Sequence, residues 1–317
     1  MAFRLDPPQS TCFQIQHLAV DRLENALEHL SKITADEPAS AVTHVHAVRR
    51  RCKQVRAVAR LVRPALGKDF APFNQTVRDA ARALAPLRNA HVAEGLLRAL
   101  DAPETTTDIP APSFDEVASA VDGARQHLRL ARRLVEQWAL PDGFGPLGSG
   151  LERTYRRGRR GWEVASGDPT TAHLHEWRKD VKDLWYQLRL LRAIAPSMLD
   201  PFIDQLDVVG EDLGHHHDIT LLLDGLANER RHLEKRRKKD PDAQVAAALA
   251  DVELAADRAD DARHQLGRSA LRNGSTVFAE EPAPFVARIE AYWDITNRSG
   301  PERGPLHHFI KSKGNHP

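Results

Sequence analysis

Two segments of the chain, 129 residues apart, carry the same row of side chains, and each row begins at a histidine. The first row, stripe 1, consists of His46, Arg49, Lys53, Arg56, Arg60 and Arg63; the second row, stripe 2, consists of His175, Arg178, Lys182, Trp185, Arg189 and Arg192. Successive members are three or four residues apart, which places each stripe on one face of an α-helix. Like charges at this spacing repel each other by roughly 0.2–0.5 kcal/mol per pair, so such a row indicates an anionic partner.

The correspondence at an offset of 129 residues extends beyond the stripes without a gap. Leu61 falls on Leu190, Leu84 falls on Leu213, and the pair Pro72-Phe73 falls on Pro201-Phe202. We therefore predict an internal duplication. It would give a first helical bundle over 12–140, a second bundle with a C-terminal helix over 141–295, and a Gly/Pro-rich tail over 296–317.

The rest of the chain also predicts an all-α fold. Short segments rich in Pro and Gly separate longer segments that are dense in Ala, Leu, Arg and Glu and have a helical period. Helices are expected over 12–32, 41–66, 70–86, 88–100, 113–139, 147–165, 170–195, 198–214, 216–238, 243–270 and 277–294.

An apolar seam precedes each stripe by one residue. The two seams are Val45, Val48, Cys52, Val55, Ala59 and Val62, and Leu174, Trp177, Val181, Leu184, Leu188 and Leu191. One residue is about 100° of helix rotation, so each cationic face is expected to border a buried face and to flank a groove between helices. Stripe 1 spans roughly 25 Å of helix, which suits an extended polyanion, and Arg and Lys suit its phosphate oxygens.

The formal net charge is only +1, so the chain as a whole is not basic. Its positive charges are instead concentrated in particular segments. Residues 43–65 contain seven Lys or Arg and no Asp or Glu. The two cysteines, Cys12 and Cys52, form no metal-binding or disulfide pattern. The N-terminus lacks the apolar run of a signal peptide, and no segment approaches the roughly 20 apolar residues of a membrane span. We expect a soluble, cytoplasmic protein.

A row of charged residues is ordinarily a solvated helix face. Two observations count against this explanation for stripe 1: it contains no carboxylate, and its pattern recurs in the second repeat. Stripe 2 is more dilute, with Glu176, Asp180 and Asp183 nearby. Trp185 is expected to be core or groove wall, with an aromatic contact to a neighbouring Arg as the alternative. The histidines would donate hydrogen bonds to phosphate, while His44 and His173 are equally well explained as packed or capping residues.

The string His215-His216-His217-Asp218 is the most metal-like in the chain and suggests a metal-dependent phosphohydrolase as an alternative function. The duplication favours another interpretation. His217 and Asp218 replace Arg88 and Asn89 of the first repeat, which is typical of polar groups at a helix start, with Asp218 or Asn89 as the N-cap.

Two further basic segments stand outside the stripes. Residues 153–160 include Tyr155 and Arg159, four residues apart and able to reach the same groove. The run from Arg230 to Lys239 lies near a predicted helix end, where dipole compensation and solubility explain it, so we interpret it as a solvated face.

The chain resembles the CHAD family, the conserved histidine α-helical domain. The resemblance rests on the paired helices with His-x-x-Arg-(Arg/Lys)-x-x-Lys, the segments 84–92 and 213–221, the Tyr155-Arg-Arg-Gly-Arg segment and the closing segment 285–293. The resemblance implies two pseudo-symmetric four-helix bundles whose basic central channel binds inorganic polyphosphate without turnover. The implied binding residues are His46, Arg49, Arg50, Lys53, Arg56, Arg60, Arg63, His175, Arg178, Lys179, Lys182, Arg189 and Arg192. A second tier consists of His44, Arg88, Tyr155, Arg156, Arg159, His173 and His217.

The chain has no room for the triphosphate-hydrolysing tunnel domain to which many relatives are fused, so it resembles a stand-alone binding module. We expect no catalysis, no cofactor and no bound metal, and an association with polyphosphate granules. Nucleic-acid binding through the same groove is ranked lower, because the stripes lack the repeated aromatic side chains on which bases stack.

Overall fold

The computed structural model describes residues 3–6, 9–33, 38–85, 87, 113–239 and 242–298. Within these ranges all regular structure is helical, which confirms the predicted all-α class. The predicted helix over 88–100, together with Arg88, Asn89 and residues 299–317 of the predicted tail, lies outside the described residues, while residues 296–298 belong to a helix. In the part of the chain that is described, no helix is long and apolar enough to cross a membrane.

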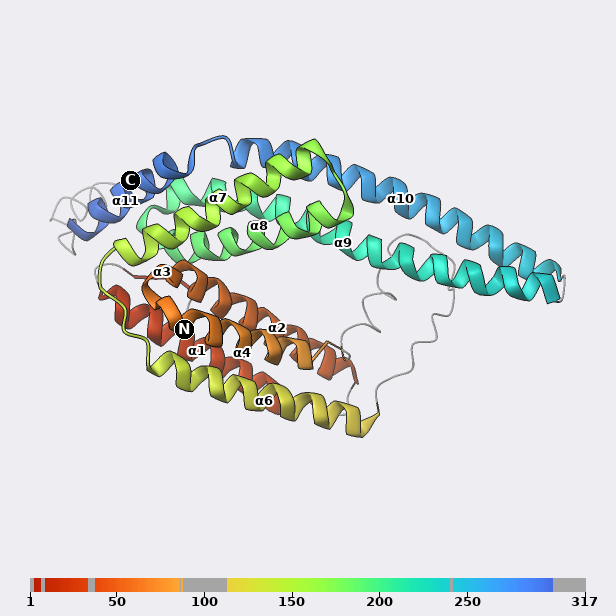
Figure 1. Ribbon diagram of the computed structural model, residues 1–317, viewed down its shortest axis with the longest axis horizontal. Coiled ribbons are helices and arrows are strands. Elements are labelled where there is room, and N and C mark those ends of the chain that lie inside the picture. The colour runs from red at the N-terminus through yellow and green to blue at the C-terminus, as the bar shows by residue number, and fades with distance from the viewer. Residues whose placement is uncertain are drawn as a thin grey trace, which may run out of the picture.

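Four helices form the first bundle: α1 (Thr11–Ser31), α2 (Pro38–Leu61), α4 (Phe70–Ala83) and α6 (Phe114–Glu136). Helix α1 packs against α2 and α6, and α4 packs against the same two helices (Figure 1). The short helix α3 (Arg63–Leu66) and a 3₁₀ turn (Gly67–Asp69) join α2 to α4. Ser113 begins α6 with a capping box, which satisfies amide groups at the helix start.

The second bundle repeats this order of contacts with longer helices. It contains α7 (Gly145–Gly167), α8 (Thr171–Leu191), α9 (Pro196–Lys239) and α10 (Ala243–Val277), and α11 (Pro282–Arg298) packs against α7. A 3₁₀ turn (Arg192–Ile194) follows α8. One continuous apolar core runs through both bundles. The duplication and the boundary at residue 140 stay predictions.

The predicted break between helices 198–214 and 216–238 is wrong, because α9 is one helix of 44 residues. Gly214 and the histidines after it were interpreted as a helix end followed by a new start. Glycine lowers helix propensity by only about 1 kcal/mol, and packing of α9 along α10 overrides this local preference.

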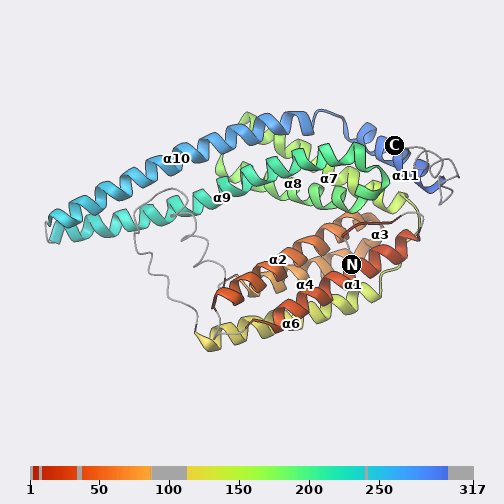
Figure 2. The same cartoon turned by 180° about the vertical axis from the view of Figure 1, so that it is seen from behind.

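The bundles meet where α2 packs against α7 and α8, as both views show (Figures 1 and 2). Gly150 of α7 makes this approach close. A Cβ atom at Gly150 would lie 1.6 Å from the carbonyl oxygen of Leu61, at the end of α2. Only a residue without a side chain fits here.

The distal halves of α9 and α10 extend past the bundles as an antiparallel pair, which we call the arm (residues 219–239 and 243–261; Figures 1 and 2). The arm has an apolar cluster of its own, separate from the main core: Ile219, Leu222, Leu226, Leu233, Val245, Leu249, Val252, Ala255 and Ala259.

Candidate functional site

The structure places stripe 1 on α2, with its last member Arg63 at the start of α3, and stripe 2 on α8, with its last member Arg192 in the following 3₁₀ turn. All residues of the two apolar seams beside the stripes are buried. His46 and Lys53 of stripe 1 are exposed, as is the neighbouring Arg50, and the other members of stripe 1 are partly buried. The predicted burial of the seams next to the cationic faces is therefore confirmed.

Uncharged groups of α4 hold two arginines of stripe 1. Nη1 of Arg49 donates a hydrogen bond to the carbonyl oxygen of Ala81 at 2.6 Å, and Nε of Arg56 donates to Oδ1 of Asn74 at 3.0 Å. Burial, followed by the charge of Arg60, lowers the pKa of Arg56 to about 10. These bonds orient the two guanidinium groups.

Carboxylates hold two cations of stripe 2, Lys182 and Arg192. Nζ of Lys182 lies 2.9 Å from Oε1 of Glu211 and 3.5 Å from Oδ1 of Asp207, both on α9. Arg192 donates two hydrogen bonds to Asp200, at 2.5 and 2.7 Å. Stripe 2 is therefore closer to electrical neutrality than its sequence suggests.

The helices that face the two stripes carry opposite charges. At the offset of 129 residues, Asp207 and Glu211 of α9 correspond to Arg78 and Arg82 of α4. Between them, Gly210 brings α9 close to Lys182, since a Cβ atom at residue 210 would lie 2.8 Å from Cε of the lysine. The part of α4 that faces stripe 1 thus carries Arg78 and Arg82, of which Arg82 pairs with Asp79, whereas the part of α9 that faces stripe 2 places two carboxylates on Lys182.

Trp185 lies between two cations of stripe 2. The guanidinium carbon of Arg189 is 4.4 Å from its ring centroid, and Nζ of Lys182 is 5.1 Å from it. The aromatic contact to a neighbouring arginine, considered as the alternative from the sequence, is therefore present. A cation over an indole face is stabilised by the ring quadrupole.

Ion pairs join the stripes at the junction of the bundles. Nη1 of Arg60, in stripe 1, lies 2.8 Å from Oδ1 of Asp183 on α8. Arg157 of α7 pairs with Asp180 and lies 3.7 Å from Oδ2 of Asp183. Burial raises the pKa of Asp183, against the opposing effect of the two arginines. Sequence reasoning counted Asp183 only as dilution of stripe 2; its place beside Leu184, on the buried side of the helix, was the available signal.

The histidines divide into two kinds. His175 of stripe 2 stacks on His217 of α9, with ring centroids 4.2 Å apart, so the structure brings these two predicted residues together. Burial, followed by the charges of Lys179 and Arg178, lowers the pKa of His175. His44 instead packs against His29, with 3.1 Å between the Nδ1 atoms.

His173 lies at the start of α8, and its Nδ1 is 2.8 Å from the carbonyl oxygen of Asp168. This position fits the alternative of a capping histidine, as packing against His29 fits the alternative for His44.

The string His215 to Asp218 lies in the middle of α9, so the prediction that Asp218 caps a helix start is wrong. Successive helical residues point about 100° apart, which separates these side chains. His216 is buried beside α10, and burial lowers its pKa to about 4. Across the described residues, no group of three or more His, Cys, Asp or Glu side chains is placed to hold a metal ion. The phosphohydrolase alternative therefore lacks a metal-binding geometry here.

The basic segment over residues 153–160 anchors α7 to α11. Tyr155 is fully buried, and its hydroxyl donates to the carbonyl oxygens of Val277 and Glu280, at 3.1 and 3.0 Å. Tyr155 therefore lies in the core and not on a groove.

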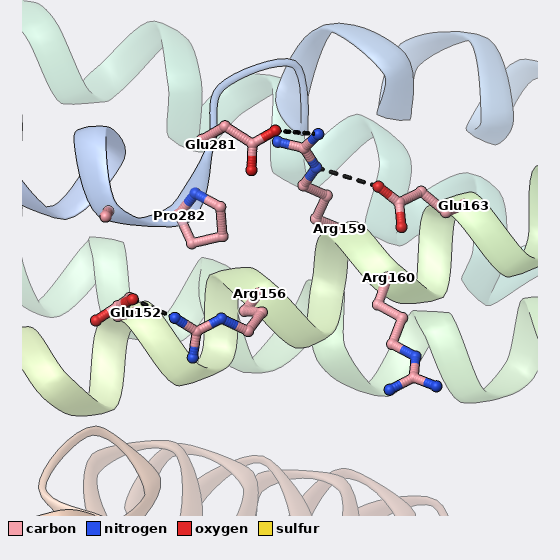
Figure 3. Close-up of a pocket in the computed structure, with 8 residues that line it drawn as sticks. Glu152, Arg156, Arg159, Arg160, Glu163, Glu281 and Pro282 are labelled. Atoms are coloured by element: carbon pink, nitrogen blue, oxygen red, sulfur yellow. Dashed lines mark hydrogen bonds and ion pairs between the residues drawn. The ribbon is translucent and has the colours of Figure 1, made fainter.

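Arg159 pairs with Glu163 and Glu281, and Arg156 pairs with Glu152, around a surface cavity of about 500 Å³ (Figure 3). Three carboxylates share this cavity with the arginines, so it suits a polyanion less well than stripe 1 does.

None of the curated proteins compared with the chain matches it. Among protein families, the model of the CHAD domain matches residues 24–227, which is more than half of the chain and includes both stripes. The match confirms the resemblance based on the two histidine-led helices. The all-helical fold, the buried seams and this match together show that the chain belongs to the CHAD domain family.

Proposed function

We propose that this protein binds inorganic polyphosphate through stripes 1 and 2, without turning it over. The observation that carries the proposal is the concentration of cations along stripe 1: residues 43–65 contain seven Lys or Arg and no Asp or Glu, and hydrogen bonds to α4 orient Arg49 and Arg56. Membership of the CHAD family supports it, since that family is associated with polyphosphate binding.

The chemistry of the ligand fits this surface. Inorganic polyphosphate is a flexible chain with about one negative charge per phosphate, and a row of cations about 25 Å long can contact several successive phosphates. Each contact that neutralises a phosphate releases condensed counterions, so affinity should fall steeply as salt is added. The proposal includes a cytoplasmic location and an association with polyphosphate granules.

Titration of the purified chain with long-chain polyphosphate at low ionic strength tests the proposal. We expect saturable binding. The variant R49A/K53A/R178A/K182A should bind at least tenfold more weakly. A charge-matched control, R129A/R133A/R268A/R272A, removes four exposed arginines outside both stripes and the arm, and it should bind almost as the wild type does.

Equal losses of affinity in the two variants would mean that polyphosphate is attracted only by diffuse positive charge. Absence of saturable binding by the wild type would refute the proposed function. Circular dichroism of each variant establishes that the helices are intact. Competition by RNA distinguishes the nucleic-acid alternative, and phosphate release from polyphosphate with Mg²⁺, Mn²⁺ or Zn²⁺ distinguishes the hydrolytic one.

A further inference from the structure

The arm presents surface that its own two helices do not cover. Its seam residues recur every three or four positions, as in a coiled coil, and so use only the sides on which α9 and α10 face each other. Leu221 and Leu254 remain half exposed on the outer sides. A surface cavity of about 400 Å³ runs along one side of the arm.

Both apolar and charged side chains line this cavity. Leu223, Leu226 and Val252 are among the apolar ones, while Arg230 of α9 and Asp257 of α10 are among the charged ones. Two helices with an apolar groove between them form half of a four-helix bundle, which is the arrangement that both bundles of this chain use.

The charges of the arm are separated along its length. Residues 230–239 of α9, at the tip, contain seven Lys or Arg and only one carboxylate, Glu234, which pairs with Arg230. Residues 251–261 of α10, nearer the bundles, contain five carboxylates and one Arg. The helices are antiparallel, so most of the basic tip of α9 lies beside the uncharged start of α10, over 243–250. The two charged segments meet only at their ends, where Arg230 lines the same cavity as Glu253 and Asp257.

We propose that the arm is a dimerisation element whose occupant is the arm of a second copy, packed antiparallel. In that orientation the basic tip of each copy lies on the acidic segment of the other, and both contacts form at once. Such an interface is isologous, with the same two segments contributed by each protomer. The apolar groove would then be buried between the arms.

The charge pattern favours a second copy over an unrelated partner. A basic partner would complement the charge of residues 251–261 only, and an acidic partner would complement the charge of the tip only. A second copy of the chain carries both an acidic and a basic segment, at the spacing that both contacts require. The family match ends at residue 227, so the tip and the acidic segment lie outside the matched region.

Two charge-reversed variants of the full chain test the proposal in the absence of polyphosphate, so that the outcome is independent of the proposed function. The tip variant is R236E/R237E/K238E, and the segment variant is D251K/E253K/D257K; all six positions are exposed. Sedimentation equilibrium at low ionic strength should give the wild type twice the mass of one chain, which is 35.4 kDa, and each variant alone the mass of one chain.

An equimolar mixture of the two variants should again sediment as a dimer, because each reversed segment then meets its new complement. Recovery in the mixture also shows that neither variant is misfolded. A monomeric wild type, variants that dimerise as well as the wild type, or a mixture that stays monomeric would each overturn the proposal.

Discussion

Arg60 of α2 donates a hydrogen bond from Nη1 to Oδ1 of Asp183 on α8, over 2.8 Å, and so joins the two bundles at their junction. Replacing Asp183 by Ala should lower the free energy of unfolding by about 3 kcal/mol, because Arg60 would lose its partner in a buried position and Arg157 would keep only Asp180. Urea denaturation measures the change. The control D200A removes the more exposed partner of Arg192 and should cost at most about 1 kcal/mol. Equal losses of stability in D183A and D200A would mean that the ion pair at the junction stabilises the fold no more than an exposed pair does.

Gly150 should be intolerant of any side chain. A Cβ atom there would overlap the carbonyl oxygen of Leu61, so Gly150→Ala has to force α7 away from α2 and should cost about 3 kcal/mol or more. Gly225→Ala is the matched control. It lies in α9 with nothing within 4 Å of its added Cβ atom, and should stabilise the protein by roughly 0.5–1 kcal/mol through helix propensity. Denaturant midpoints that shift the same way in both variants would contradict the described approach of the helices.

The two stripes should contribute unequally to polyphosphate binding. R49A/K53A removes charge from the stripe that faces Arg78 and Arg82, whereas R178A/K182A removes charge from the stripe that faces carboxylates. We expect the first variant to lose more affinity, by several fold, and to show the larger decrease in salt dependence. Isothermal titration at two salt concentrations gives both quantities. Equal slopes would show that the acids of α9 do not weaken stripe 2.

Removing the acids of α9 should strengthen binding. In D207N/E211Q, Lys182 loses its two carboxylate partners and its charge becomes available to phosphate. Affinity for polyphosphate should rise several fold at low ionic strength, and less at high salt because screening reduces the gain. The variant E290Q/D294N is the control, since it removes two exposed acids from α11, outside both stripes and the arm. An increase of the same size there would point to net charge alone.

His216 should make the protein less stable in mild acid. Burial, with smaller effects from Arg263, His217 and His264, lowers its pKa from 6.5 to about 4. Between these values the unfolded chain binds a proton that the folded protein does not, so the stabilising contribution is complete above about pH 6.5 and is lost as the pH falls towards 4. The loss from this residue is roughly 3 kcal/mol. Unfolding of His216→Gln, compared with wild type at pH 7 and pH 4.5, should show a smaller loss, whereas the exposed-site control His232→Gln should behave as the wild type does.

The fold class and the buried seams could be predicted because they follow from periodicity within single helices. Val48 and Val181 are buried for the same reason that Arg49 and Lys182 lie at the edge of the core: one residue turns the helix by about 100°. The length of α9 could not be predicted in this way. Gly214 and His215 suggest an interruption locally, and only packing along α10 keeps the helix continuous.

The partners of the stripe cations were beyond prediction because they lie far along the chain. Asp183 is 123 residues from Arg60, and Ala81 reaches Arg49 through a backbone oxygen that no sequence pattern marks. Tyr155 shows the converse error. Its neighbouring arginines indicated a surface role, but its contacts with Phe285 and with carbonyl oxygens place it in the core.

The hydrogen bonds from Arg49 to Ala81 and from Arg56 to Asn74 also bear on the thermodynamics of ligand capture. A free arginine side chain loses up to about 2 kcal/mol of rotamer entropy when it is fixed. Here part of that loss occurs when the bundle folds and does not recur when a polyanion arrives. Among ligands of equal charge, such a surface favours a chain whose anionic groups repeat at the fixed spacing of the guanidinium groups over one whose charges are scattered.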